Sequence, residues 1–324
     1  MDEFIHYIKN KTSFKLVVFS CPRHLGENIN GLTMRQILEK NKIIYYESPD
    51  INQDKDLKKE IYKNTLGIGM GASWIFKRET VELFAKNQML DFMGIDLPRY
   101  RGGAHYTWRI LHQNRIGSLN FQIIHGGIET FHQGEVVYAE KFLFPKNLRR
   151  AFDFFNFQLK KEFDFFKNFL KKVERRDDFK ATELNEKESS YFPFLSTKDN
   201  GLINWSWGGE DICLFINAFD DPYPGASTYL GDEKIYLKDC RLLKAVEHYH
   251  SFTTGIVIRK NSDGIFIAAG NNLLNVKKVA TEKGADFMEK IQKGDRLYTP
   301  LGELEKALCF KAIYGARGLK RKAS

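Results

Sequence analysis

The chain has 324 residues and a formal net charge of +9, and 43% of its residues are hydrophobic while 28% are charged. This composition excludes a largely disordered chain, and the length predicts one large domain with a smaller one. The opening sequence lacks the cationic and apolar regions of a signal peptide, and no apolar run is long enough to cross a bilayer, so we expect a cytoplasmic protein. The positive charge favours an anionic partner.

The cysteine and histidine patterns give no indication of a metal centre. The four cysteines are widely scattered without a C-x-x-C pair, which predicts reduced thiols. His248 and His250 form a His-x-His pair, but no third ligand is evident, so a hydrogen-bonded surface pair is favoured over a zinc site. We therefore expect no bound metal.

Predicted strands and helices alternate through the first 144 residues. The expected strands cover residues 15–20, 43–48, 64–71, 89–93, 118–126 and 135–144. The expected helices cover residues 33–41, 56–64, 77–87 and 105–113. This alternation predicts an α/β fold with a doubly wound, mostly parallel sheet and helices on both faces. In such sheets ligands bind beyond the carboxyl ends of the strands.

The second half of the chain begins with a long helical pattern over residues 147–173. Apolar residues recur at intervals of three and four, which predicts a helix packed on the first domain. The polar composition that follows suggests a linker, and we place the α/β domain at 1–185, the linker at 186–200 and a second domain at 201–324. After one helix at 210–219, short alternating segments predict a small β-rich module.

Residues 88–103, QMLDFMGIDLPRYRGG, run from an apolar strand through a Leu-Pro-x-x-Arg-Gly-Gly turn toward a helix. The window resembles the motif of formyl-tetrahydrofolate-dependent formyltransferases, in which a strand ends in Asn-x-His and continues through Leu-Pro-x-x-Arg-Gly. Here Asp91 stands at the Asn position and Met93 at the His position. Residues 203–230 are similar to the start of the second domain in methionyl-tRNA formyltransferase and in the aminoarabinose formyltransferase domain. The resemblance implies a smaller, open-barrel-like C-terminal domain.

The resemblance also implies a chemistry, in which an amine attacks the formyl carbon of the folate. In the family, Asn and His stabilise the oxyanion, His moves protons, and an Asp from a later loop orients the His. Glu129 takes that Asp position if residues 131–133 are an insertion, whereas His132 takes it if the match is anchored at Gly134. All three positions thus depart from the family pattern.

These departures matter chemically, because an ionised Asp91 only accepts hydrogen bonds and Met93 cannot move a proton. Loss of an oxyanion donor typically lowers the rate about a hundred- to a thousandfold. His105, His125 and His132 follow the relevant turns and could replace the missing imidazole, although each is individually more often structural. A protonated Asp91 could also donate a hydrogen bond if burial raised its pKa.

Two further sets of residues are candidates for binding. The resemblance implies that the segment GMGASWIF holds the pterin of folate through backbone groups and an apolar wall, with candidates Gly69, Met70, Trp74 and Phe76. The alternative is that its glycines only allow a strand and a helix to pack closely. The turn is expected to contribute substrate-binding residues, namely Pro98, Arg101, Gly102 and Gly103. Arg101 would fix either the loop or an anionic ligand.

The leading hypothesis is transfer of a formyl group from formyl-tetrahydrofolate to the amine of an anionic acceptor, such as an amino-sugar nucleotide. The runner-up is a relative that kept the fold and binds a ligand or partner without transfer. A tRNA acceptor is disfavoured, because methionyl-tRNA formyltransferase would be expected to retain the Asn and His. The sequence is compatible with a homodimer but does not specify the oligomeric state.

Overall fold

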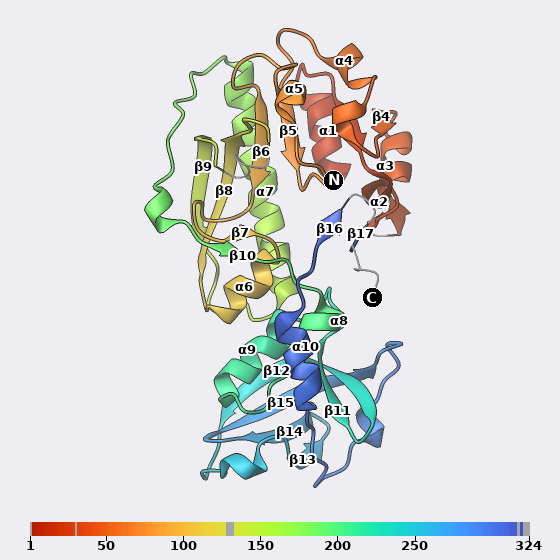
Figure 1. Ribbon diagram of the computed structural model, residues 1–324, viewed down its shortest axis with the longest axis vertical. Coiled ribbons are helices and arrows are strands. Elements are labelled where there is room, and N and C mark those ends of the chain that lie inside the picture. The colour runs from red at the N-terminus through yellow and green to blue at the C-terminus, as the bar shows by residue number, and fades with distance from the viewer. Residues whose placement is uncertain (1, 30, 128–132, 316–317, 320–324) are drawn as a thin grey trace.

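The computed structural model describes residues 2–29, 31–127, 133–315 and 318–319, which form an upper and a lower lobe in Figure 1. The upper lobe contains the chain from α1 to β10, and the lower lobe contains the segment from α8 to α10. Among the described residues, no helix is both long and apolar enough to cross a membrane.

The first lobe is an α/β structure, as predicted. Its main strands are β1 (Val17–Ser20), β4 (Ile44–Glu47), β5 (Gly67–Met70), β6 (Met89–Met93), β8 (Ile116–Ile123) and β9 (Val136–Leu143). Its helices are α1 (Asp2–Lys11), α2 (Pro22–Leu25), α3 (Met34–Lys40), α4 (Leu57–Glu60), α5 (Arg78–Val81), α6 (His105–Leu111) and α7 (Ala151–Glu174). Short elements complete it: β2 (Asn28–Ile29), β3 (Leu32–Thr33), β7 (Arg101–Gly102), β10 (Tyr191–Phe192), η1 (Ile51–Gln53) and η2 (Glu186–Glu188).

Parallel and antiparallel pairs both occur in this lobe. Strand β1 pairs with β4, and β5 with β6, in parallel, whereas β8 runs antiparallel to β6 and β9 antiparallel to β8. Strands β1 and β4 form a two-stranded sheet of their own, and in the four-stranded sheet β5-β6-β8-β9 the parallel pair continues into two antiparallel strands. The alternation of elements does not by itself reveal strand direction, which explains why the sequence did not predict this change.

The phenylalanine-rich helix α7 packs on one face of this sheet. Phe121 of β8 is buried, and its ring lies 5.2 Å from that of Phe165 and 4.1 Å from that of Phe169. The N-terminal helix α1 packs on the same helix through Phe4 and Phe166, whose rings are 4.8 Å apart. Because successive strand residues point to opposite faces, the neighbours of Phe121 project away from α7.

The second lobe is a β-rich module with helices on it. Its strands are β11 (Ala226–Leu230), β12 (Glu233–Lys244), β13 (Val257–Asn261), β14 (Gly264–Ala269) and β15 (Asn272–Thr281), and they form one antiparallel sheet in the order β11-β12-β15-β14-β13. Its other elements are α8 (Thr197–Asn200), α9 (Gly209–Ala218), α10 (Leu301–Cys309), η3 (Ser251–Thr253) and η4 (Met288–Lys290). After α10, the short antiparallel pair β16 (Tyr314–Gly315) and β17 (Gly318–Leu319) lies beside the first lobe in Figure 1.

The junction between the lobes involves both the predicted linker and two helices. Helix α6 of the first lobe packs against α9 of the second. Within residues 186–200, β10 pairs in parallel with β7 before the chain enters α8. The domain boundaries stay a prediction, but this pairing ties the linker to the Arg-Gly-Gly turn.

Candidate functional site

A row of three residues crosses the sheet on the face opposite α7. Gly69 of β5, Asp91 of β6 and Gln122 of β8 lie directly across from one another. Side chains opposite one another on adjacent strands share a face, so Asp91 and Gln122 project together. Gly69 leaves room for the carboxyl group, because a Cβ added at Gly69 would lie 3.1 Å from Asp91 Oδ1.

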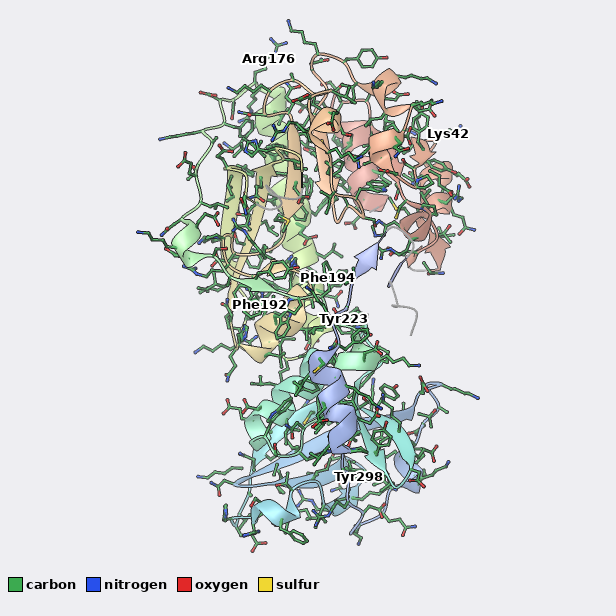
Figure 2. The ribbon with its side chains drawn as sticks, viewed as in Figure 1. Lys42, Arg176, Phe192, Phe194, Tyr223 and Tyr298 are labelled. Atoms are coloured by element: carbon green, nitrogen blue, oxygen red, sulfur yellow. The ribbon has the colours of Figure 1, made fainter. Side chains whose placement is uncertain are left out.

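This face opens into a cavity of about 630 Å³, a volume typical of small-molecule sites. The first lobe contributes residues 71–76, which follow β5, together with residues 91–94 at the end of β6 and residues 102–105. The second lobe contributes Phe219 and Tyr223. Figure 2 labels Phe194 and Tyr223, both lining residues, at the junction of the lobes. The cavity thus lies beyond the carboxyl ends of β5 and β6.

An aromatic wall forms one side of this cavity, and the first lobe holds it in place. Trp74 and Phe76 line the cavity. The indole Nε1 of Trp74 donates a hydrogen bond of 3.1 Å to the Pro49 carbonyl, and the Phe76 carbonyl accepts one of 2.8 Å from the amide of Gly127. Asn52 donates to the Ile75 carbonyl at 3.0 Å. These bonds fix the wall before a ligand binds.

Asp91 is the titratable group at the floor of the cavity. Burial raises the pKa of its carboxyl group to about 7, and a hydrogen bond from the backbone at Phe92 offsets only part of that increase. Near neutral pH the group therefore exists in both protonation states. Its protonated form can donate a hydrogen bond, which an ordinary, ionised aspartate cannot do at this pH. Its ionised form is also a stronger base than an ordinary aspartate and can accept a proton.

His105 lines the same cavity, at the start of α6. Its Nε2 lies 3.1 Å from the carbonyl oxygen of Gly102, so the ring donates to that carbonyl through this nitrogen. Burial lowers the pKa of His105 to about 4, with Arg109 contributing in the same direction. The imidazole is therefore neutral at pH 7 and holds the turn in position.

A positive charge also lies at this cavity, on Arg23 of the short helix α2 that follows β1. Its Nη2 contacts His24 Nε2 at 2.7 Å and donates to Ser73 Oγ at 3.0 Å, while Nη1 lies 3.4 Å from Glu27 Oε1. Burial, and then the Arg23 charge, lowers the pKa of His24, which leaves that ring neutral and able to accept. The buried Nε of Arg23 has no hydrogen-bond partner within the described part of the chain.

Comparisons with known proteins find similarity to formyltransferases. Residues 195–292 match the formyl transferase C-terminal domain. The chain is 26% identical over 274 residues to the methionyl-tRNA formyltransferase of Rickettsia felis, covering 84% of this chain and 85% of the relative. It is 25% identical to the methionyl-tRNA formyltransferase of Acetivibrio thermocellus over 183 residues, which are 56% of each chain. The chain is thus similar to formyltransferases over most of its length.

The fold of this chain also matches solved structures. The N-formyltransferase from Helicobacter canadensis, in complex with folinic acid and dTDP-3-aminofucose, superposes with a TM-score of 0.60 at 17% identity. The match covers 85% of this chain and 94% of that one. At this identity the likeness concerns the fold, an α/β domain followed by a β-rich domain.

The two positions at which this chain departs from the Asn-x-His pattern both lie at the cavity. Asp91 and Met93 line it together, and Met93 is buried against Ile95 and Leu97. The side-chain amide of Asn120 donates to the carbonyl oxygens of Met93 and Ile95, at 3.3 and 2.6 Å. The end of β6 is therefore held rigidly although its side chains differ from the family pattern.

The Arg-Gly-Gly turn divides into residues that line the cavity and residues that support it. Gly102 and Gly103 line the cavity, whereas Pro98 and Arg101 do not. Arg101 is buried and donates to both carboxylate oxygens of Glu186, at 2.6 and 2.7 Å, and to Ser189 Oγ at 2.8 Å. Of the two roles expected for Arg101, the structure shows the one that fixes the loop.

The other predicted residues lie in different places. Gly69 contacts Asp91 from β5, and the side chain of Met70 is 47% exposed, outside the cavity lining. His125, one of the possible replacement imidazoles, pairs with Glu135 at 2.7 Å and does not line the cavity. The two loop candidates, Glu129 and His132, lie outside the described residues. His248 and His250 each make a local hydrogen bond, to Asn271 and from Phe252.

Sequence reasoning did not single out several of the lining residues, among them Arg23, Gln122 and Tyr223. Gln122 could have been found, since the alternation of β8 places it on the face opposite Phe121. Arg23 lies in α2, directly after the first strand, near a known position for ligands in α/β sheets. Tyr223 comes from the second lobe, and no local pattern indicates that it reaches this cavity.

Proposed function

We propose that this protein transfers a formyl group from formyl-tetrahydrofolate to the amine of a small anionic acceptor, such as an amino-sugar nucleotide. The observation that carries the proposal is the Asp91 carboxyl group, whose pKa is raised to about 7 by desolvation, on the floor of a cavity bounded by an aromatic wall. It stands at the position where the family pattern has Asn.

The aromatic wall suits the donor. Trp74 and Phe76 present flat apolar surfaces, and residues 122–124, 126 and 127 also line the cavity. Such a combination suits a pterin ring, which is flat and carries hydrogen-bonding groups at its edge. Formyl-tetrahydrofolate would supply the one-carbon group at this place, with its ring held by Trp74 and Phe76.

Asp91 can take over the two roles that the family assigns to Asn and His, which are replaced here by Asp91 and Met93. Protonated Asp91 donates a hydrogen bond to the formyl oxygen as negative charge develops there. The amine nitrogen forms a bond to the formyl carbon, and the bond from that carbon to the folate nitrogen breaks. Asp91 gives its proton to the departing nitrogen, and its carboxylate then takes the proton that the amine loses. A pKa near 7 suits a group that both gives and accepts a proton at neutral pH.

The acceptor is argued from charge. Arg23 places a guanidinium at the cavity, and the net charge of the chain is +9. A guanidinium matches the oxygens of a phosphate group in geometry and charge. The Helicobacter canadensis relative is described with dTDP-3-aminofucose, an anionic amino sugar of this chemical class. A nucleoside-diphosphate amino sugar thus fits the charge of this cavity.

The test is a transfer assay with the full chain, formyl-tetrahydrofolate and a panel of nucleoside-diphosphate amino sugars, in which mass spectrometry detects the formylated product. We expect turnover to fall about a hundredfold or more in Asp91→Ala. The matched control is Asp232→Ala, which removes an exposed carboxylate from the β11–β12 turn and should leave turnover unchanged. Product from methionyl-tRNA alone would contradict the proposed acceptor. Binding of folinic acid without product from any acceptor would favour the ligand-binding alternative.

A further inference from the structure

A second cavity, of about 570 Å³, lies where α6 packs on α9, and it shares no lining residue with the first. The first lobe contributes the end of α6 and nearby residues up to Phe154 in α7, and the second lobe contributes α9 and β12. The cavity is therefore built from both lobes.

The charged residues that line this cavity are all positive. Its lining contains the arginines Arg109, Arg115, Arg149 and Arg241, and no lining residue, all of them within the described chain, is Asp or Glu. Three carboxylates are bonded to lining residues. Asp239 accepts from the Arg149 guanidinium at 3.1 Å, Asp153 accepts from the Arg149 backbone amide at 3.2 Å, and Glu210 accepts from Gln113 at 3.2 Å. Among the described residues, only Arg149 of the four lining arginines thus has a carboxylate bonded to its guanidinium group.

Arg109 and Arg115 use backbone oxygens in place of acidic partners. Arg109 is 1% exposed, donates to the Ile116 carbonyl, and has a buried Nε without an acceptor among the described residues. Arg115 donates to the carbonyls of Pro145 and Leu148, at 3.2 and 2.7 Å. Burial lowers the pKa of both groups. A desolvated cation without a counter-ion is unfavourable, so an anion in this cavity would be stabilising.

Arg241 adds an exposed charge on β12. No hydrogen bond or ion pair of its side chain occurs within the described part of the chain, so its guanidinium is available to a ligand. The lining residues Leu242 and Leu243 follow it and are each 38% exposed. Apolar surface beside a cationic group suits an organic molecule that carries phosphate better than inorganic phosphate alone.

We propose that this second cavity binds a small phosphorylated metabolite, whose phosphate groups are held by Arg115, Arg149 and Arg241. A guanidinium group can donate two hydrogen bonds to the oxygens of one phosphate group. Protein carboxylates neutralise only part of the positive charge of these arginines. Arg115 belongs to the first lobe and Arg241 to the second, so the bound anion links the lobes. This site is independent of formyl transfer, because none of its residues lines the first cavity.

The experiment measures binding of inorganic pyrophosphate, used as the probe, to the full chain by isothermal titration calorimetry. We expect the dissociation constant to rise at least about tenfold in Arg241→Glu, because hydrogen bonds between charged groups are worth more than one factor of ten. Since Arg241 is exposed and unpaired within the described chain, the variant should fold normally. Arg115→Gln is a second variant, with the same expected direction. The matched control is Arg259→Glu, an exposed arginine on β13, for which the affinity should be unchanged.

The first cavity also contains an arginine, so its contribution is measured separately. Pyrophosphate binding should persist in Arg23→Gln if the second cavity is the site. Loss of binding in Arg23→Gln with normal binding in Arg241→Glu would overturn the proposal, as would no binding to the wild-type chain. A short single-stranded RNA that binds through the same arginines more tightly than pyrophosphate would assign the site to nucleic acid and overturn the small-molecule class.

Discussion

Gly69 and Asp91 lie opposite each other on the parallel strands β5 and β6, and a Cβ added at Gly69 would lie 3.1 Å from Asp91 Oδ1. At that separation the carboxyl group must shift by a few tenths of an ångström to accommodate a methyl group. Gly69, from the segment GMGASWIF, is therefore coupled to Asp91, from the window 88–103, because the two residues lie on neighbouring strands.

Gly69→Ala should consequently impair the site more than the fold. We expect turnover to fall about tenfold, because small displacements of a reacting group are costly in rate, whereas the free energy of unfolding should change by no more than about 1 kcal/mol. Steady-state kinetics and urea denaturation measure the two quantities. The control is Gly302→Ala in α10, where an added Cβ meets no atom within 4 Å. Equal turnover in wild type and Gly69→Ala would contradict the coupling.

The pKa of Asp91 predicts how stability depends on pH. The folded state keeps the Asp91 proton up to about pH 7, whereas the unfolded chain releases it near 3.8. The associated stability is fully present below pH 3.8 and is lost as pH rises through 7, in total on the order of 4 kcal/mol. Asp91→Asn has no carboxyl group to titrate, so its free energy of unfolding should not show this loss. From pH 5 to pH 8 the variant should therefore become more stable relative to wild type. Urea denaturation measures the difference in free energy of unfolding between the variant and wild type. If that difference is the same at pH 5 and pH 8, Asp91 titrates normally.

His105 should produce the opposite dependence. Its pKa is lowered from 6.5 to about 4, so the folded state keeps it neutral while the unfolded chain becomes charged below pH 6.5. The stability of the neutral ring is present above pH 6.5 and is lost as pH falls to 4, on the order of 3 kcal/mol. His105→Gln retains a donor for the Gly102 carbonyl and should therefore resist acid better than wild type. Denaturation at pH 4.5 and pH 7.5 tests this, and identical acid sensitivity would contradict it.

Sequence reasoning succeeded where a local pattern determines the structure. The predicted strand 89–93 coincides with β6, and the predicted helix 147–173 with α7 within a few residues. The helix expected over 77–87 covers only Arg78–Val81, and beyond it the amides of Leu83 and Phe84 donate to the carbonyls of Thr80 and Val81, three residues back, so the chain continues in turns. Asp91 was identifiable from its motif, whereas its raised pKa required knowledge of burial, and Tyr223 required knowledge of how the lobes meet.

The pair formed by Arg101 and Glu186 should act on the loop without taking part in proton transfer. Both carboxylate oxygens of Glu186 accept from Arg101. A double-mutant cycle with Arg101→Gln and Glu186→Gln should give a coupling free energy of about 1 to 2 kcal/mol. In Arg101→Gln we expect the KM for the acceptor to rise, because Gly102 and Gly103 lose their support, while the pH dependence of kcat stays the same. A shifted pH profile would instead place Arg101 in the chemistry.

The departures at Asp91 and Met93 can be tested by restoring the family pattern. Asp91→Asn alone keeps a hydrogen-bond donor but removes the proton carrier, so turnover should fall below wild type. Adding Met93→His supplies an imidazole beside the cavity and should raise turnover by about a hundredfold over that single variant. The buried position of Met93 beside Ile95 and Leu97 predicts a cost of about 1 to 3 kcal/mol in stability, so folding is checked first.

The control for this restoration is Asp91→Asn with Met93→Leu, which changes the same positions without supplying a proton carrier. Recovery in the histidine variant alone would mean that the rest of the site, including the wall at Trp74, is complete for transfer. A histidine variant that folds and binds folinic acid, yet turns over no faster than the leucine control, would contradict a recoverable formyltransferase site. In that case the surroundings of Asp91, rather than its chemistry alone, would have changed, and ligand binding without transfer would become the better account of the cavity.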